Sequence, residues 1–300
     1  MSIFKKIGQN NEKEQVLTDK KGIFLYFELL LRKFWNYIKL NLLYVLTSLL
    51  TFAFYFVICA GFVVPVILGT IPEENFKIMA DAAGGMDLEL FYGSLIWALS
   101  CIMSLIIITF FGGGVCSAGY HYILRNYARQ ENAYVFSDYF QHTKLNFKQS
   151  FLLSLIDKLL VSMLLISASY YYAMMFESNS GFVPVIAFAL MIFALYLYGA
   201  MHIYMWTMMV TFKVTLKQLF KNSFLLTIGT AVRTVFYILS MLIFTVLAVI
   251  LFANSQIFVI VFYIILLFVL VDLAGHLVSY PVIKKYMIDN NNKNEEGTEN

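Results

Sequence analysis

Apolar positions in this chain fall into long blocks that are separated by short polar segments. Six blocks exceed 25 residues each, and they run from Leu40 to Gly69, Phe91 to Gly119, Ser150 to Phe176, Phe182 to Phe212, Ser223 to Phe252 and Ile257 to Ile283. About 20 predominantly apolar residues are enough for an α-helix to cross a bilayer. The pattern therefore predicts an all-α membrane protein with six transmembrane helices.

The polar segments alternate in their content of lysine and arginine. Basic residues occur before the first block and after the second, fourth and sixth: Lys33, Lys39, Arg125, Arg129, Lys144, Lys148, Lys213, Lys217, Lys221, Lys284 and Lys285. The intervening segments contain one basic residue, Lys77, which lies among acidic residues. Short cytoplasmic loops are enriched in Lys and Arg, so we predict a multi-pass protein with both termini in the cytoplasm.

We expect one membrane domain, residues 40–283, between an amino-terminal segment, 1–39, and a carboxyl-terminal tail, 284–300. Apolar residues recur at helical spacing from Ile23 to Ile38, which is typical of an amphipathic helix on the inner leaflet. A cytoplasmic extension of the first span is the alternative. The tail is rich in Asn and Glu and lacks apolar residues after Ile288, which is typical of disorder.

Parts of the sequence are repeated. The segment 147–155 recurs in similar form as 220–228, and a weaker copy occupies 38–43. Each copy lies where a basic segment meets an odd-numbered block. The repeats predict three consecutive helical hairpins, each preceded by an amphipathic cytoplasmic lead-in helix.

Composition excludes several classes of protein. Apolar residues make up 61% of the chain and charged residues 13%, whereas a soluble domain has about 25% charged residues. A net charge of +3 is too small to indicate nucleic-acid binding, and attraction to anionic inner-leaflet lipids explains the basic residues. The cysteines Cys59, Cys101 and Cys116 lie within apolar blocks, which favours buried side chains over disulfides or metal ligands. We expect neither a metal nor a cofactor.

Residues 114–154 resemble a known family. A small-residue stretch, 114–120, is followed by the aromatic and basic segment 124–131, by Tyr139 and Phe140, and by the lysine-bearing segment 146–150. Together with Arg32-Lys33-Phe34-Trp35, this pattern resembles the YesL-like family of bacterial membrane proteins of unknown function. The resemblance implies an accessory protein of the bacterial cell membrane, associated with carbohydrate uptake or sensing. It implies no catalytic residue.

Ionisable residues also occur inside the apolar blocks, where a charge costs at least about 2.5 to 3.5 kcal/mol. Counting about 1.5 Å per residue from the nearest cytoplasmic lysine places Asp157, His202, Arg233 and Asp272 about 13 to 18 Å deep. We therefore expect the ionisable residues to form one layer in the inner half of the membrane. They are Asp157, Lys158, His202, Arg233, Asp272 and His276.

The spacing of these residues suggests how they pair. Asp157 and Lys158 point about 100° apart on a helix, so each is expected to contact another span. Asp272 and His276 share a helix face, and we expect Arg233 to neutralise Asp272. The layer is either a set of contacts that fixes the bundle or a proton or substrate pathway, with a metal site or catalysis as further alternatives.

Other residues are interpreted as structural. Gly112, Gly113 and Gly114 permit close helix contact or a kink, and the methionines from Met201 to Met209 are typical of a helix interface. His121 and His142 flank a basic loop and are expected to be solvated. The sequence contains no HExxH, GxSxG or P-loop motif, so we do not expect an enzyme.

Two functions remain. The first is an accessory or scaffold membrane protein that binds a transporter or sensor protein through a cytoplasmic surface formed by Arg125, Arg129, Tyr139 and Phe140. The second is a small secondary transporter or channel that uses the intramembrane layer. A polar cavity that reaches the layer favours transport, and a dry, fully paired layer favours a scaffold.

Overall fold

The computed structural model of the chain describes residues 20, 22–111, 114–177, 181–235, 237–239, 242, 261 and 263–288. Five of its helical stretches are long and apolar enough to cross a membrane: Phe34–Leu68, Leu88–Phe111, Phe147–Met174, Val183–Met209 and Ile265–Ile288. The regular elements within the described ranges are all helices. The helical class predicted from the apolar blocks is therefore confirmed for these residues.

The first stretch is composite, since a π-helical turn interrupts it. The long helices are α3 (Phe34–Ile58), followed by η1 (Cys59–Val63) and α4 (Val64–Leu68), then α6 (Leu88–Phe111), α9 (Phe147–Met174), α10 (Val183–Met209), and α14 (Phe268–Ile283) between η2 (Tyr263–Leu267) and η3 (Lys284–Ile288). The shorter helices are α2 (Gly22–Arg32), α5 (Glu73–Ala82), α7 (Ser117–Ala128), α8 (Val135–Leu145) and α11 (Leu216–Gly229).

The predicted fifth span, 223–252, is not one straight helix. A capping box fixes the start of α11, where Thr215 and Gln218 exchange side-chain to backbone hydrogen bonds of 3.3 and 2.9 Å. The chain then bends by 93° between α11 and the helical segment Ala231–Leu239. These two helices are long and apolar enough for a crossing only when they are taken together, and residues 243–260 lie outside the described part of the chain.

The predicted second span, 91–119, ends early. Helix α6 stops at Phe111, and the separate helix α7 begins at Ser117. Ten of the 12 residues of α7 are buried, so this helix is an interior element. A Cβ atom at Gly119 would lie 2.0 Å from the carbonyl oxygen of Tyr139 in α8. The absence of a side chain at Gly119 therefore allows α7 and α8 to pack closely.

Helix α2 is separate from the first span, because Lys33 interrupts the helix between Arg32 and Phe34. Its apolar residues Ile23, Phe24, Phe27 and Leu31 are exposed, as expected for a helix at the membrane interface. Residues 1–19 and 289–300 lie outside the described part of the chain, whereas residues 284–288 of the predicted tail are helical.

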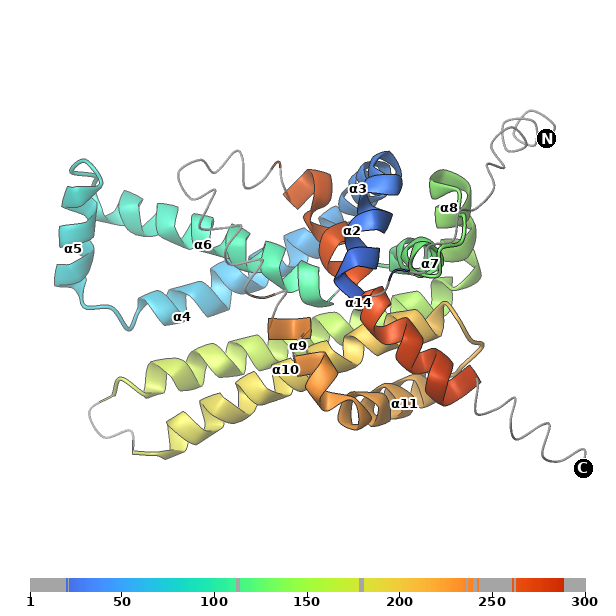
Figure 1. Cartoon of the computed structure of the whole chain (residues 1–300). Coiled ribbons are helices and arrows are strands. Elements are labelled where there is room, and N and C mark those ends of the chain that lie inside the picture. Colours follow the sequence, from blue (N-terminus) through green and yellow to red (C-terminus); the bar gives the residue numbers. More distant parts are fainter. Residues whose placement is uncertain are drawn as a thin grey trace, which may run out of the picture.

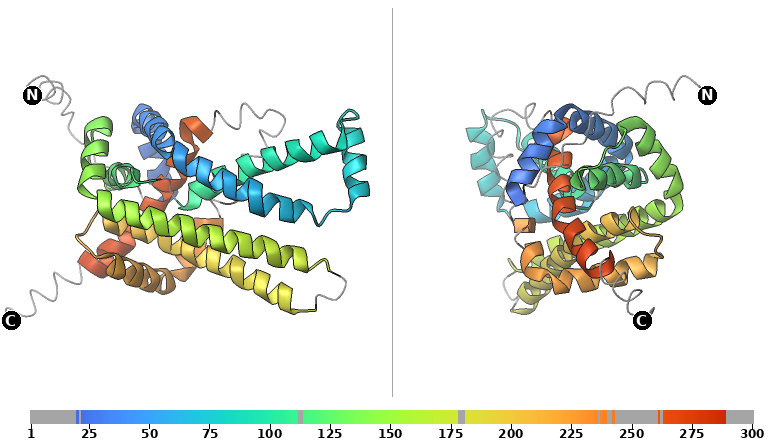
Figure 2. Two further views of the ribbon diagram at one scale, coloured as in Figure 1. Left: turned by 180° about the vertical axis from the view of Figure 1, so that it is seen from behind. Right: turned by 45° about the vertical axis from the view of Figure 1, so that its right-hand side comes forward.

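The long helices form two layers that α14 connects. Helices α9 and α10 run side by side in both ribbon views, while α3, α4 and α6 form the other layer (Figure 1, Figure 2). Helix α14 contacts α3, α7 and α10. Of the three predicted hairpins, α9 and α10 form one and α5 joins the helices of another, whereas much of the third falls on residues outside the described ranges. The arrangement as three related hairpins stays a prediction.

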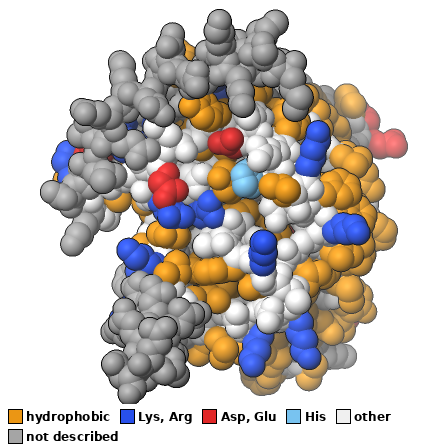
Figure 3. Space-filling model, turned by 90° about the vertical axis from the view of Figure 1, so that its right-hand side faces the viewer, with side chains coloured by type: hydrophobic (Ala, Val, Ile, Leu, Met, Phe, Trp, Pro, Cys, Tyr) orange, Lys and Arg blue, Asp and Glu red, His pale blue; other side chains and the backbone are white. Residues whose placement is uncertain are grey.

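The two ends of the molecule differ in charge. The acidic helix α5 lies at one end, and α7, α8 and the end of α14 lie at the other (Figure 1). On the second end face, Lys and Arg side chains are distributed among apolar ones (Figure 3). The basic segments that alternate along the sequence thus come together at one end of the bundle.

Candidate functional site

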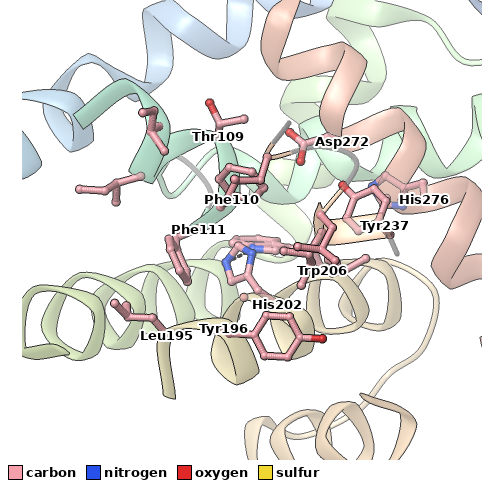
Figure 4. Close-up of a pocket in the computed structure, with 18 of the residues that line it drawn as sticks. Thr109, Phe110, Phe111, Leu195, Tyr196, His202, Trp206, Tyr237, Asp272 and His276 are labelled. Carbon is pink, nitrogen blue, oxygen red and sulfur yellow. Dashed lines mark hydrogen bonds between the residues drawn. The ribbon is translucent and has the colours of Figure 1, made fainter. Parts of the chain in front are cut away.

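A cavity of about 440 Å³ lies between α6, α7, α10, α14 and the segment Ala231–Leu239 (Figure 4). Its walls are mainly apolar, and Met103, Ile106, Phe110, Phe111, Leu195 and Ile203 are among the residues that form them. Its polar wall consists of Thr109, His121, Tyr196, His202, Trp206, Thr207, Tyr237, Asp272 and His276. Three members of the predicted layer, His202, Asp272 and His276, therefore line a single cavity.

Asp157 joins this group from α9. Its carboxylate accepts a short hydrogen bond from the Tyr198 hydroxyl, and its Oδ2 lies 3.2 Å from Nε2 of His202. Both partners belong to α10, so Asp157 contacts another span as the sequence predicts. A buried carboxylate with these two partners ties α9 to α10.

His202 Nε2 is shared between two neighbours. The indole N–H of Trp206 lies 2.8 Å from the same nitrogen and donates to it. A ring nitrogen either accepts a hydrogen bond or donates one, because it has a single in-plane position for a proton or a lone pair. His202 therefore has two exclusive states. Nε2 accepts from Trp206 in one state and donates to Asp157 in the other.

A second chain of hydrogen bonds joins α7, α10 and α14. His121 Nδ1 lies 3.0 Å from His276 Nε2, and His276 Nδ1 lies 3.0 Å from the Thr207 hydroxyl. Thr207 Oγ1 also lies 2.8 Å from Ser279 Oγ and 3.0 Å from the carbonyl oxygen of Ile203.

One assignment of protons gives every donor in this chain a partner. Ser279 and His276 Nδ1 donate to Thr207, which donates to Ile203, and His121 Nδ1 donates to His276 Nε2. Unpaired buried N–H groups are rarer than unpaired acceptors, so this assignment is preferred. It keeps both imidazoles neutral and leaves His121 Nε2 as a lone pair with no partner among the described residues.

His121 is buried, although the sequence predicted a solvated side chain. Its ring stacks on Trp206 at a centroid distance of 4.9 Å. Burial, followed by the neighbouring His276 and His202, lowers the pKa of His121 well below its ordinary value. The prediction was wrong because α7 turns into the bundle. His142 is half-buried and stacks on Tyr122.

Asp272 lies in the cavity wall and is half-buried (Figure 4). Tyr120 of α7 is nearby, and burial together with the Asp272 carboxylate raises the pKa of Tyr120 well above its ordinary value. The predicted contact of Asp272 with His276 is not formed, because His121 and Thr207 occupy both nitrogens of His276. None of the described residues that line the cavity is lysine or arginine.

Arg233 does not pair with Asp272. Its side chain is exposed and lies with Pro281, Lys285 and Tyr286 beside the end of α14. The depth predicted for Arg233 assumed a straight helix, and the bend before Ala231 invalidates that count. Lys158 also departs from the prediction, because its ammonium donates to Ser154 Oγ, 2.5 Å away in the same helix.

The predicted partner surface is divided between interior and exterior. Arg125 is buried and donates to the carbonyl oxygen of Val210, where α10 ends. Tyr139 is fully buried, and its hydroxyl lies 2.6 Å from Thr47 Oγ1. Arg125 and Tyr139 are therefore structural, and assigning them to the surface was wrong. Arg129 is partly exposed and pairs with Glu131, and Phe140 is exposed.

Sequence reasoning missed Tyr198, Trp206 and Thr207. Tyr198, His202 and Trp206 are four residues apart, so they lie along one face of α10. That polar stripe within an apolar helix was a usable signal. The neighbouring Met205, Met208 and Met209 are buried, as expected for a helix interface. Within the described residues, no group of three or more His, Cys, Asp or Glu side chains could hold a metal ion.

The fold and the cavity define a helical protein whose apolar helices are long enough for several membrane crossings and whose interior contains a pocket lined by histidine and aromatic residues. Residues 90–168, from α6 into α9, match the family model described as "Protein of unknown function, DUF624", the family that contains YesL-like proteins. The matched segment includes His121 and Asp157 and the whole of residues 114–154, which resemble YesL-like proteins. No curated protein and no solved structure matches the chain.

Proposed function

We propose that the protein is a small secondary transporter that binds its solute in the central cavity. The observation that carries this proposal is the cavity itself, of about 440 Å³, with Asp272 and three histidines in its wall. Largely apolar cavities with a few polar groups are typical of small-molecule sites. Ionisable residues inside membrane helices commonly mark solute or proton routes.

The proposed orientation places the basic end of the molecule in the cytoplasm of a bacterial cell. Support comes from the separation of charge, since α5 and the basic segments lie at opposite ends of the bundle (Figure 1). Excess Lys and Arg on one side is the usual sign of a cytoplasmic face. The cavity then lies between the two faces, where alternating access requires a binding site.

Filling the cavity tests the proposal. Leu195 lines the cavity, whereas Leu190 on the same helix is exposed on the outside of the bundle. Purified wild-type protein, L195W and L190W would be placed in vesicles containing a pH-sensitive dye and exposed to organic cations, organic anions and sugars. The proposal expects at least one solute to change the internal pH, with the response lost in L195W and kept in L190W. Identical responses of the two variants to every solute would contradict it.

An accessory role is the second candidate, and the exposed aromatic residues of α8 favour it. Phe136 and Phe140 are 59% and 46% exposed at the basic end of the molecule. On this proposal they contact a transporter or sensor protein in the same membrane. Affinity purification from native membranes should then recover a stoichiometric partner that F136S/F140S loses, while L31S on the exposed face of α2 retains it. Recovery of the partner with both variants would exclude this surface.

A further inference from the structure

Among the described residues, no fixed positive charge lies beside the carboxylate of Asp272. Tyr120 from α7 and Tyr237 from the segment Ala231–Leu239 interact with it. The other titratable or hydroxyl groups of the same cavity include His121 from α7, His202 and Thr207 from α10, and His276 from its own helix. The hydrogen-bond chain keeps His121 and His276 neutral, and the Tyr237 hydroxyl donates to the carbonyl oxygen of Val271. No lysine or arginine occurs among the described lining residues.

Neither Arg125 nor Arg233 lines the cavity. Arg125 donates to Val210 and Asn126, and Arg233 is exposed beside the end of α14. A charged carboxylate inside a membrane protein requires a cation or a proton. Either a proton on Asp272 or a bound cation in the cavity would meet this requirement.

Aromatic side chains form much of the remaining wall. Phe110, Phe111, Tyr196, Trp206 and Tyr237 all line the cavity (Figure 4). The faces of such rings attract cations, and they do so more strongly where water is excluded. One carboxylate among aromatic and aliphatic walls matches a molecule with a large apolar body and a single positive charge.

Other solutes fit this cavity less well. An anion would need a positive group, and none of the described lining residues supplies a fixed one. A sugar would need many free hydrogen-bonding groups, whereas Thr207, His276 and His202 already bond to protein partners. Each unpaired polar group of a buried sugar would weaken binding.

We propose that the cavity binds lipophilic organic cations and that each bound cation displaces one proton from Asp272. The exchange balances charge, because one positive charge enters as one proton leaves. The inference rests on the proposed transport function and names its solute class. It also identifies the proton as the coupling ion, since a proton returns to Asp272 when the cation is released.

The experiment uses two ions of nearly the same size and shape but opposite charge, tetraphenylphosphonium and tetraphenylborate. Of the tryptophans, Trp35 and Trp97 are exposed whereas Trp206 lines the cavity. A W35F/W97F background in a neutral detergent therefore makes tryptophan fluorescence report on Trp206 alone. Tetraphenylphosphonium should quench it saturably, release about one proton per bound ion into weakly buffered solution, and bind more tightly as pH rises. Tetraphenylborate should not bind.

Asp272→Asn should weaken tetraphenylphosphonium binding at least about tenfold and abolish proton release, because the isosteric amide carries no charge. Glu89→Gln, at an exposed acid in the first turn of α6, is the matched control and should change neither. If D272N does not fold, pH-independent binding of the cation to wild-type protein would overturn the inference. Equal quenching by both ions would overturn the solute class while leaving a binding cavity. Quenching by neither ion, together with no response to any solute in vesicles, would overturn the transport proposal as well.

Discussion

At the scale of single residues, hydrogen-bond partners determine the protonation of the cavity histidines. His276 has a partner at each nitrogen, and His202 has two partners at one nitrogen. The sequence assigned Asp157, His202, Asp272 and His276 to one layer, and three of these four line the cavity. The pairings could not be predicted, because they depend on the rotation of each helix, which residue counts do not give.

The contact of Asp157 with Tyr198 should be measurable by a double-mutant cycle. We expect D157N and Y198F each to lower thermal stability in detergent. Their coupling energy should be about 0.6 kcal/mol, the average for hydrogen bonds between membrane helices, and at most about 1.7 kcal/mol. S162A in the same helix α9 is a control, because its buried hydroxyl has no partner among the described residues. Strictly additive effects of D157N and Y198F would show that the two side chains do not interact.

His121 predicts a dependence of stability on pH. Its folded-state pKa is below the ordinary value of 6.5, mainly through burial. Below about pH 6.5 the unfolded chain binds a proton at this residue that the folded chain does not, so the free energy of unfolding falls as pH decreases. Melting temperatures in detergent between pH 7.5 and 5 should decline, and H121Q should flatten the decline. H142Q, at a half-buried histidine, should flatten it less. A decline unchanged by H121Q would contradict this assignment.

At the scale of elements, two breaks decide the architecture. The first is the end of helix α6 before α7 begins, which divides the second apolar block. The second is the 93° bend between α11 and the segment Ala231–Leu239. Hydropathy detects neither break, because the residues on both sides are apolar. The glycines from Gly112 to Gly114 signalled the first break as a kink or a close contact, and a Cβ at Gly114 would lie 3.2 Å from Thr51 Oγ1. The bend had no comparable signal beyond Gly229 and Thr230.

Close packing of α7 on α8 makes Gly119 intolerant of a side chain. We expect G119A to lower stability by about 1 to 3 kcal/mol, because its Cβ would lie 2.0 Å from the carbonyl oxygen of Tyr139. Gly93 in α6 is the matched control, since a Cβ there meets nothing within 4 Å. G93A should be neutral or stabilise by up to about 1 kcal/mol through helix propensity. Chemical or thermal unfolding in detergent measures both variants.

Arg125 and Arg129 are about one helical turn apart in the sequence, but replacing them should change stability by different amounts. Arg125 is buried and caps the carboxyl end of α10 through Val210. R125Q should cost about 1.5 to 3 kcal/mol, the range for hydrogen bonds to charged groups. R129Q removes a partly exposed ion pair with Glu131 and should cost less than about 1 kcal/mol. Equal losses would mean that Arg125 does not act as this cap.

At the scale of the whole molecule, the alternation of basic segments along the sequence predicts which segments lie at the same end of the bundle. Segments far apart in the sequence meet at one end because α3 and α6, and likewise α9 and α10, run out and back along the bundle (Figure 1). The cavity could not be predicted in the same way, since its walls come from six parts of the chain, including α9 through Leu165, and depend on α7 entering the bundle. Counting residues along a straight helix placed Arg233 deep in the membrane, although its side chain is exposed in the structure.

Reporter fusions test the orientation. We expect reporters placed after Asn300 and near Gly22 to indicate cytoplasm, and one inserted near Gly84 to indicate the exterior. Gly84 lies in the exposed turn after α5, where its φ of +101° marks a turn that an insertion can extend. An exterior signal from the carboxyl terminus would contradict an even number of crossings.

The interior position of α7 has a consequence for biogenesis. With 12 residues, α7 is too short to be inserted as a crossing of its own. Its polar side chains, Arg125 and His121 among them, must enter between helices that are already in the bilayer. Helix α14 packs on α7 and follows the other long helices in the chain, so α7 is synthesised well before this part of its surroundings. Ribosome stalling before α14 should leave a proteolytically sensitive α7, and synthesis of α14 should protect it.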